Sequence, residues 1–163
     1  MASHLAVKHM DAYAHDVLQP RIDCVGGVVV DERARLLLVR RGQEPARGTW
    51  SVPGGRVEAD ESDVAATARE VLEETGLRVA VGPLVGSVER DAPGGGVYVI
   101  RDYLCRPEAH VDPDAIRAGD DAVEARWFAV QELSALNTAP GLVDALTGWG
   151  IVRLLVERSE GRG

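Results

Sequence analysis

Three glutamates lie close together near the middle of the chain, in the segment REVLEE. Glu70, Glu73 and Glu74 would share one face of a helix, because successive helical residues turn by about 100°. Like charges at this spacing repel one another. Mg²⁺ or Mn²⁺ would remove the repulsion, since both bind carboxylate oxygens and keep positions open for phosphate oxygens. The pattern therefore predicts a platform for a divalent cation.

A solvated acidic face is the alternative interpretation of these residues. Such a face normally mixes acids with lysines and arginines, but Arg69 is the only basic residue of the expected helix at residues 62–75. It can orient Glu73 four positions later, yet one arginine cannot neutralise three acids. Apolar residues of the segment, among them Val71 and Leu72, fall at other angles, so we expect the face opposite the glutamates to pack against the protein.

A Pro-Gly-Gly sequence at residues 53–55 leads into this helix. Glycines let a chain turn tightly and bring its own carbonyl and N–H groups close to a ligand. Arg40, Arg41 and Arg47 precede the turn and could bind the negative charge of a phosphate, although ordinary surface arginines would look the same in the sequence. The loop is therefore a candidate point of approach for a metal and a phosphate group.

Residues 55–77 match a known signature: a glycine, five residues, a glutamate, seven residues, and then R-E-U-x-E-E-x-G-U, where U is a bulky aliphatic residue. The matching residues are Gly55, Glu61, Arg69, Glu70, Val71, Glu73, Glu74, Gly76 and Leu77, with no departure. Chance agreement at all of them is well below about one in a million. The chain therefore resembles the Nudix hydrolases, and the resemblance extends over residues 22–136.

The resemblance implies roles for these residues. The implied metal ligands are Glu70, Glu73, Glu74 and the carbonyl of Gly54. The implied catalytic residues are Glu73, Arg69 and Glu70, with Glu73 favoured as the general base, Arg69 holding a glutamate in place and Glu61 structural. The substrate-binding candidates are Arg40, Arg41, Arg47 and Gly55. Family members differ in where the base lies, and some use a carboxylate of a later loop. The candidates for such a base are Asp120, Asp121 and Glu124, and a plain solvated acid is the other interpretation of each.

The implied reaction is the Mg²⁺-dependent hydrolysis of the pyrophosphate bond of a nucleoside diphosphate linked to another group. ADP-ribose or a similar nucleotide sugar is the favoured substrate, because Pro93 follows Leu77 by sixteen positions, as in ADP-ribose-hydrolysing relatives, although a hairpin loop favours proline as well. Oxidised or ordinary nucleoside triphosphates, such as 8-oxo-dGTP, are the alternative substrates. A nucleotide-binding module without activity is a further alternative, against which the intact signature argues.

Segments of apolar periodicity around the signature predict the elements that position it. The expected strands are residues 22–30, 35–40, 50–52, 79–89, 97–105 and 126–130, and the expected helices are residues 62–75 and 141–157. This mixture predicts an α/β fold in a single domain, with a mixed β-sheet sandwiched between α-helices (α/β/α). We expect this domain to span residues 11–163 and residues 1–10 to be left over from expression cloning.

Composition sets further limits on function and location. The chain has 163 residues and a formal net charge of −8, which argues against binding a nucleic-acid polymer, since that requires a basic face. Cys24 and Cys105 lie in apolar runs and are expected to be buried, reduced thiols of a cytoplasmic protein. No apolar run is long enough to span a bilayer, and no signal peptide is evident. The apolar final helix could pack within the chain or form a homodimer.

Overall fold

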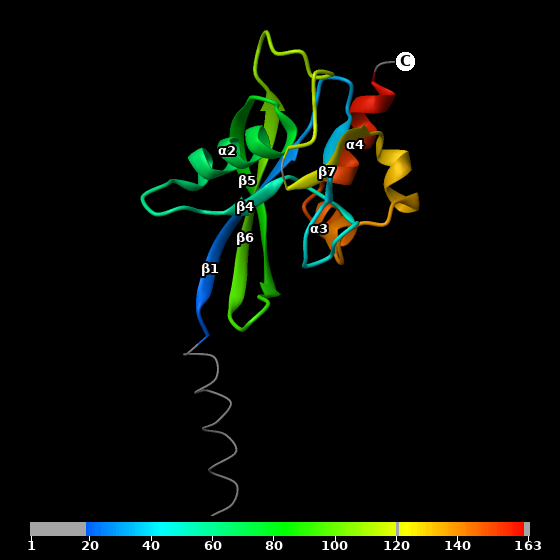
Figure 1. Cartoon of the computed structure of the whole chain (residues 1–163). Helices are drawn as coiled ribbons and strands as arrows, with labels where there is room; N and C mark the ends of the chain where they lie inside the picture. Colours follow the sequence, from blue (N-terminus) through cyan, green and yellow to red (C-terminus); the bar gives the residue numbers. More distant parts are fainter. Residues whose placement is uncertain (1–18, 120, 162–163) are drawn as a thin grey trace, which may run out of the picture.

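The structure is a computed structural model that describes residues 19–119 and 121–161 (Figure 1). The expected cloning remnant at residues 1–10 and the candidate base Asp120 lie outside the described residues. The elements, of which η1 is a 3₁₀-helix, are β1 (Arg21–Val29), β2 (Leu36–Arg41), β3 (Trp50–Ser51), β4 (Gly54–Arg56), α2 (Asp63–Thr75), β5 (Val79–Asp91), β6 (Val97–Pro107), β7 (Ala122–Phe128), η1 (Val130–Ala135), α3 (Leu142–Gly148) and α4 (Ile151–Glu160). The predicted strands are all present, with bounds shifted by up to a few residues.

The strands form two sheets. The first has the order β4-β1-β6-β5 and is mixed, because β1 and β6 are parallel while the outer pairs are antiparallel. The second has the order β3-β2-β7 and is antiparallel. Helix α2 lies over the first sheet, whereas α3 and α4 lie beside β7 (Figure 1). The predicted α/β fold with a mixed sheet between helices is confirmed, and its strands are divided between two sheets.

Strands β1 and β2 are buried on both sides. Val28 and Leu38 pack with residues of α3 and α4, whereas Val29 and Leu37 pack with Val71 of α2. Successive residues of a strand point to opposite faces, so one apolar run supplies both hydrophobic cores. This explains why the two segments are continuously apolar instead of alternating with polar residues.

The Gly-Gly pair of β1 lets α2 approach the first sheet closely. A Cβ at Gly27 would lie 2.6 Å from Cγ2 of Val71 and 3.5 Å from Cγ2 of Thr67. The helix begins at a cap formed by Ser62 and ends at Gly76, which has a φ of 70°, both as the sequence predicts. The depth and the ends of α2 are therefore set by residues that flank the glutamates.

The side of α2 that packs is not the predicted one. Thr67, Val71 and Thr75 are buried, whereas Leu72, expected on the packing face, is 38% exposed. The buried threonines satisfy their hydroxyls within the helix, since Thr67 donates to the carbonyl of Asp63 at 2.7 Å and Thr75 to that of Val71 at 2.6 Å. The packing face therefore contains polar residues and lies next to the glutamates instead of opposite them.

The predicted closing helix at residues 141–157 is two helices. The chain leaves α3 at Gly148 and enters α4 through Gly150, which has a φ of 77°, a conformation that glycine adopts without strain. Leu146, Ile151 and Leu155 are still buried in one cluster, so the apolar spacing survives the break. Within the described part of the chain, no helix has the length and apolar character needed to cross a bilayer.

Both cysteines belong to the core. Cys24 and Cys105 are buried and form no disulfide. Burial raises the pKa of both thiols, that of Cys105 to about 12. A thiol that stays protonated is a poor nucleophile, so both act as small apolar side chains, as predicted.

One acidic side chain lies inside the first sheet without a partner. Asp102 of β6 is 4% exposed, and its Oδ1 accepts no hydrogen bond from any described residue. Its cross-strand neighbours are Gly26 and Gly86, and a Cβ at Gly26 would lie 2.1 Å from this oxygen. Burial raises the pKa of Asp102 to about 6. The ionised form is therefore disfavoured in the folded protein.

Asp102→Asn should make stability less dependent on pH. An acid whose pKa rises on folding destabilises the fold as pH rises through the interval between its unfolded and folded values, here 3.8 and about 6. The variant should exceed the parent in free energy of unfolding by up to about 3 kcal/mol above pH 6, and the gap should close towards pH 4. Urea unfolding of both proteins between pH 4 and pH 7 measures this difference in free energy of unfolding. A gap that is constant with pH would contradict the assignment.

Gly27→Ala should destabilise the protein by about 1–3 kcal/mol, because the added methyl group overpacks the contact between β1 and α2. Gly148→Ala is the matched control, since a Cβ there meets no atom within 4 Å. The control should leave stability unchanged or raise it by up to about 1 kcal/mol. Chemical unfolding of the two variants provides the comparison. Equal changes in their free energies of unfolding would show that the close approach of α2 to β1 does not contribute to stability.

Candidate active site

Two of the three clustered glutamates contact the glycine pair of β4. The N–H of Gly54 donates to Oε2 of Glu74 at 3.1 Å. The carboxylate of Glu70 lies against Gly55, where a Cβ would be 2.4 Å from its Oε1. Only glycine leaves this space free, so the predicted close approach of the backbone is present.

Arg69 ties the glutamates to the start of the signature. Its Nε and Nη2 donate to the two oxygens of Glu61 at 2.8 and 2.9 Å, and its Nη1 donates to Glu70 at 2.7 Å. A longer contact of 3.3 Å reaches Glu73, and Nη2 also donates to the carbonyl of Arg56 at 3.0 Å. The hydrogen bonds with Arg69 lower the pKa of Glu61. Arginine supplies this planar fork and lysine does not, so Arg69 fixes the position of Glu70.

The three glutamates differ in their surroundings. Burial raises the pKa of Glu74 to about 7, an effect that the N–H of Gly54 partly opposes. Burial also raises the pKa of Glu70, against the opposing effect of Arg69. The side chain of Glu73 is 59% exposed on the outer side of α2. Two desolvated carboxylates on one helix are unfavourable when both are ionised, and a bound cation removes that penalty.

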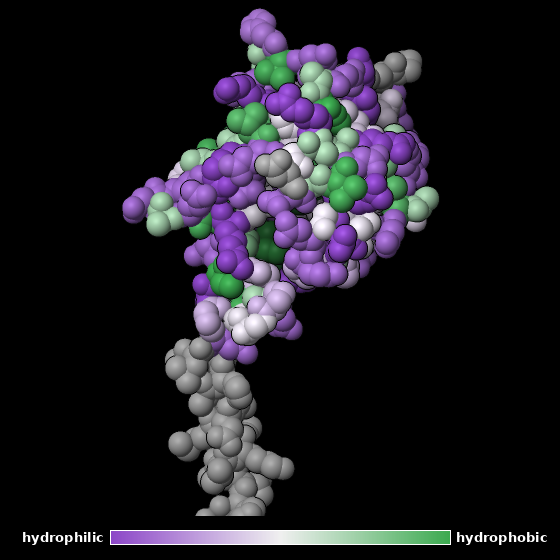
Figure 2. Space-filling view, in the orientation of Figure 1, coloured by the Kyte–Doolittle hydropathy of each residue, from purple (hydrophilic) through white to green (hydrophobic). Residues whose placement is uncertain are grey.

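Two cavities meet at the glycine pair. The acidic cavity, of about 280 Å³, is lined by Glu70, Glu74 and Asp121 among others. The apolar cavity, of about 650 Å³, lies between the first sheet and the segment that leads into α3. The residues common to both linings are Arg41, Glu44, Ser51, Gly54, Gly55 and Arg56. Figure 2 shows a hollow in the mainly hydrophilic surface with hydrophobic residues at its base.

The acidic cavity fits a hard divalent cation. Its lining offers carboxylate and backbone oxygens, which are the ligands that Mg²⁺ and Mn²⁺ prefer. Within residues 19–119 and 121–161, no three acidic, cysteine or histidine side chains converge as a closed metal site would require. Mg²⁺ keeps several waters and combines one or two carboxylates with substrate phosphates, so a partial set of side chains suits it. The desolvated pair Glu70 and Glu74 is such a set.

The structure separates the predicted phosphate-binding arginines. Arg41 lines both cavities and donates its Nε to the carbonyl of Pro45 at 2.7 Å. Arg40 pairs instead with Glu124 at 3.2 Å, and Arg47 is exposed. Arg56 also lines both cavities and was not predicted from the sequence. Its position directly after the glycine pair was the signal that could have identified it as a phosphate-binding candidate.

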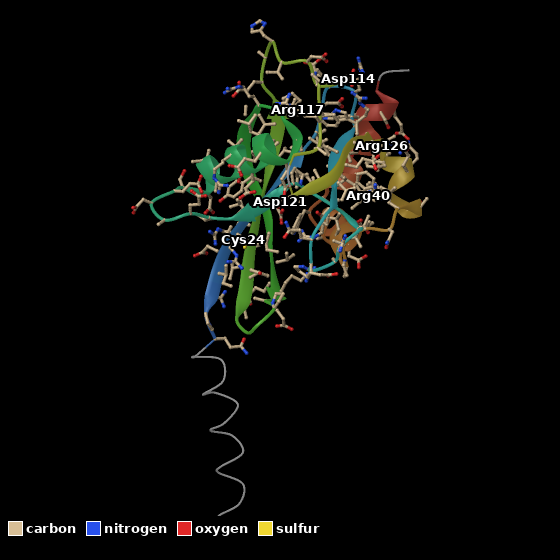
Figure 3. All side chains as sticks on the ribbon, viewed as in Figure 1. Cys24, Arg40, Asp114, Arg117, Asp121 and Arg126 are labelled. Carbon is tan, nitrogen blue, oxygen red and sulfur yellow. The ribbon has the colours of Figure 1, made fainter. Side chains whose placement is uncertain are left out.

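One loop carboxylate reaches the acidic cavity. Asp121 lies beside α2 (Figure 3), and its Oδ1 accepts a hydrogen bond from Nε2 of Gln43 at 2.7 Å. The loop before it is fastened to the end of α2, since the N–H of Gly119 donates to the carbonyl of Glu74 at 3.0 Å. Glu124 lies further along β7, paired with an arginine of β2. The structure therefore brings Asp121, and not Glu124, to the glutamates.

Comparisons with known proteins give a consistent result. The NUDIX domain model matches residues 20–146. A MutT-like protein from Streptomyces ambofaciens is 40% identical over 129 residues, which cover 77% of each chain. An ADP-ribose pyrophosphatase from Methanocaldococcus jannaschii is 37% identical over 111 residues, which cover 66% of this chain and 62% of that protein. The crystal structure of a MutT NUDIX hydrolase from Burkholderia pseudomallei superposes with a TM-score of 0.68 at 26% identity, over 79% of this chain and 98% of that chain.

These matches agree with the signature and with the geometry of the glutamate helix. Members of the family act on small nucleotide substrates and generally use divalent cations such as Mg²⁺ or Mn²⁺. The family model covers most of the chain, including the whole signature at residues 55–77. The chain therefore belongs to the NUDIX family and is a pyrophosphohydrolase.

Proposed function

We propose that this protein hydrolyses the pyrophosphate bond of ADP-ribose or a similar nucleotide sugar, with Mg²⁺ or Mn²⁺ as cofactor. The observation that carries the proposal is the meeting of the apolar and acidic cavities at Gly54 and Gly55. A cavity of about 650 Å³ has the size of a small-ligand site and suits a nucleoside. The acidic cavity suits the cation and the diphosphate, which would reach it along the shared wall.

The chain's own residues then have distinct tasks. Glu70 and Glu74, with the carbonyl of Gly54, would hold the cation, and Glu73 would contribute from the outer side of the helix. When bound, the cation neutralises phosphate charge and lowers the pKa of the attacking water. Arg41 and Arg56 line the shared wall, where they would bind phosphate oxygens and stabilise the charge that develops on the leaving group.

A general base must accept a proton from the attacking water. Glu73 remains the proposed base on the strength of the family resemblance; its carboxylate is 59% exposed, lines neither cavity and keeps a contact of 3.3 Å with Arg69. Asp121 is the second candidate because it lines the acidic cavity. Glu73→Gln and Asp121→Asn separate the two, since loss of the base lowers kcat while nucleotide affinity is kept.

The choice of ADP-ribose rests on similarity and size. The relative from Methanocaldococcus jannaschii is an ADP-ribose pyrophosphatase, and the apolar cavity has room for a nucleoside. Pro93 lies in the turn between β5 and β6. Turn geometry alone accounts for a proline there, so this residue adds no support from the structure.

A substrate panel tests the proposal. With Mg²⁺, ADP-ribose should give AMP and ribose 5-phosphate with a kcat/KM at least about tenfold above that of dinucleoside polyphosphates and of normal or oxidised triphosphates. A chelator should abolish turnover, and hydrolysis in ¹⁸O-water should show which product takes up the solvent oxygen. Preferred conversion of 8-oxo-dGTP to its monophosphate would show that nucleoside triphosphates are the substrates instead.

Glu74→Gln should lower Mg²⁺-dependent kcat/KM by at least about 100-fold, because it removes a charged ligand from the acidic cavity. The fold should be retained, since the amide does not carry the desolvation penalty that raises the pKa of Glu74. Glu32→Gln, at an exposed acid of the turn after β1, is the control and should behave like the parent. Steady-state kinetics and calorimetric titration with Mg²⁺ measure the effect. Parent-like turnover in the Glu74 variant would remove this residue from the cation site.

Arg69→Lys should lower kcat by about 10–100-fold with little change in KM, because lysine cannot donate two hydrogen bonds to Glu61 while a third nitrogen holds Glu70. Arg153→Lys is the matched control, since Arg153 is an 83% exposed side chain of α4. Kinetics and unfolding curves should be recorded together. A loss of stability with unchanged kcat would show that Arg69 is structural only.

A further inference from the structure

The buried end of the apolar cavity contains an ionisable group. Asp102 lines this cavity although it is 4% exposed, and among described residues nothing donates to its Oδ1. Tyr98 and Ile100 lie at alternate positions of the same strand and also line the cavity. Asp102 is therefore a buried carboxylate beside aromatic and aliphatic residues, whereas the other acids that line the cavity, Glu44 and Asp91, are exposed.

An aromatic ring lies on the same side of the sheet. Gly86, on β5, is paired across the strands with Asp102, so both residues face the same side. A Cβ at Gly86 would lie 2.0 Å from Nε1 and Cε2 of Trp149, so the indole occupies the space above this glycine. Trp149 also lines the apolar cavity. The indole that lies over Gly86 of β5 and the carboxylate of Asp102 on β6 are thus neighbours, a combination that suits a planar heterocycle.

The carboxyl group is unfavourable in the free protein. An unpartnered buried charge is strongly disfavoured, and its removal usually stabilises a fold. Burial raises the pKa of Asp102 to about 6, which still leaves it ionised above neutral pH. A ligand that donates a hydrogen bond would satisfy it, and groups of this kind are characteristic of binding sites.

We propose that Asp102 selects the nucleobase, by accepting a hydrogen bond from the amino group at the 6-position of adenine or the 4-position of cytosine. The inference rests on the proposed function, because it takes the ligand to be a nucleotide. An ionised carboxylate only accepts hydrogen bonds, so the carbonyl oxygen of hypoxanthine or uracil at the same place would leave two buried acceptors facing each other. Stacking on Trp149 tolerates any base, so the discrimination falls on Asp102.

Binding of AMP and IMP, measured by calorimetry on the full chain, tests the role directly. The two nucleotides differ at the 6-position of the base. The parent should bind AMP at least about tenfold more tightly than IMP, and Asp102→Asn should bring the ratio close to one, because an amide both donates and accepts. With ADP-ribose and its hypoxanthine counterpart, the same change should appear in KM and not in kcat, since the base is remote from the reacting phosphorus.

Asp144→Asn, at an exposed acid of α3, is the matched control and should keep the preference for AMP. Asp102→Ser replaces the asparagine variant if that variant fails to fold, and it should also lose the preference. Equal binding of AMP and IMP by the parent, or an unchanged preference in a folded Asp102 variant, would overturn the inference. Because nucleotide binding needs no turnover, an absence of hydrolysis would overturn the proposed function alone.

Discussion

The contact between the carboxylates of α2 and the backbone of Gly54 and Gly55 determines the rest of the site. It exists because Gly27 lets the helix lie close to the first sheet and Gly55 leaves room for Glu70. Arg69 then fixes the rotamer of Glu70 from outside. The resulting desolvation is unfavourable for the empty site, and the same desolvation strengthens the attraction of the pair for a cation.

Local signals in the sequence predicted the helix and the identity of the family. Ser62 and Gly76 delimit α2 as expected, because capping depends on a few neighbouring residues. The contact of Arg69 with Glu73 follows from their i, i+4 spacing along the helix, whereas its shorter contact with the adjacent Glu70 does not. The roles assigned to the glutamates came from the signature, and the structure brings Glu70 and Glu74, but not Glu73, to the glycine pair.

Features that depend on distant segments were missed. The prediction of the packing face of α2 was wrong. The hydroxyl of Thr67 is satisfied within the helix, so this polar residue can be buried although hydropathy alone would place it in solvent. The break at Gly150 was missed because the apolar spacing continues through it. Asp102 was missed because its environment comes from glycines of two other strands, although an acid among the inward positions of an apolar strand was a usable signal.

The consecutive glycines of β1 face opposite sides of the first sheet. Gly27 lies under Val71 of α2, whereas Gly26 lies against Asp102 of the apolar cavity. One strand thus separates the helix that carries the glutamates from the buried part of the cavity proposed to hold the nucleoside. If Asp102 selects the base, substitutions around it would change the preferred metabolite while the glutamates of α2, on the opposite face of the sheet, keep their neighbours.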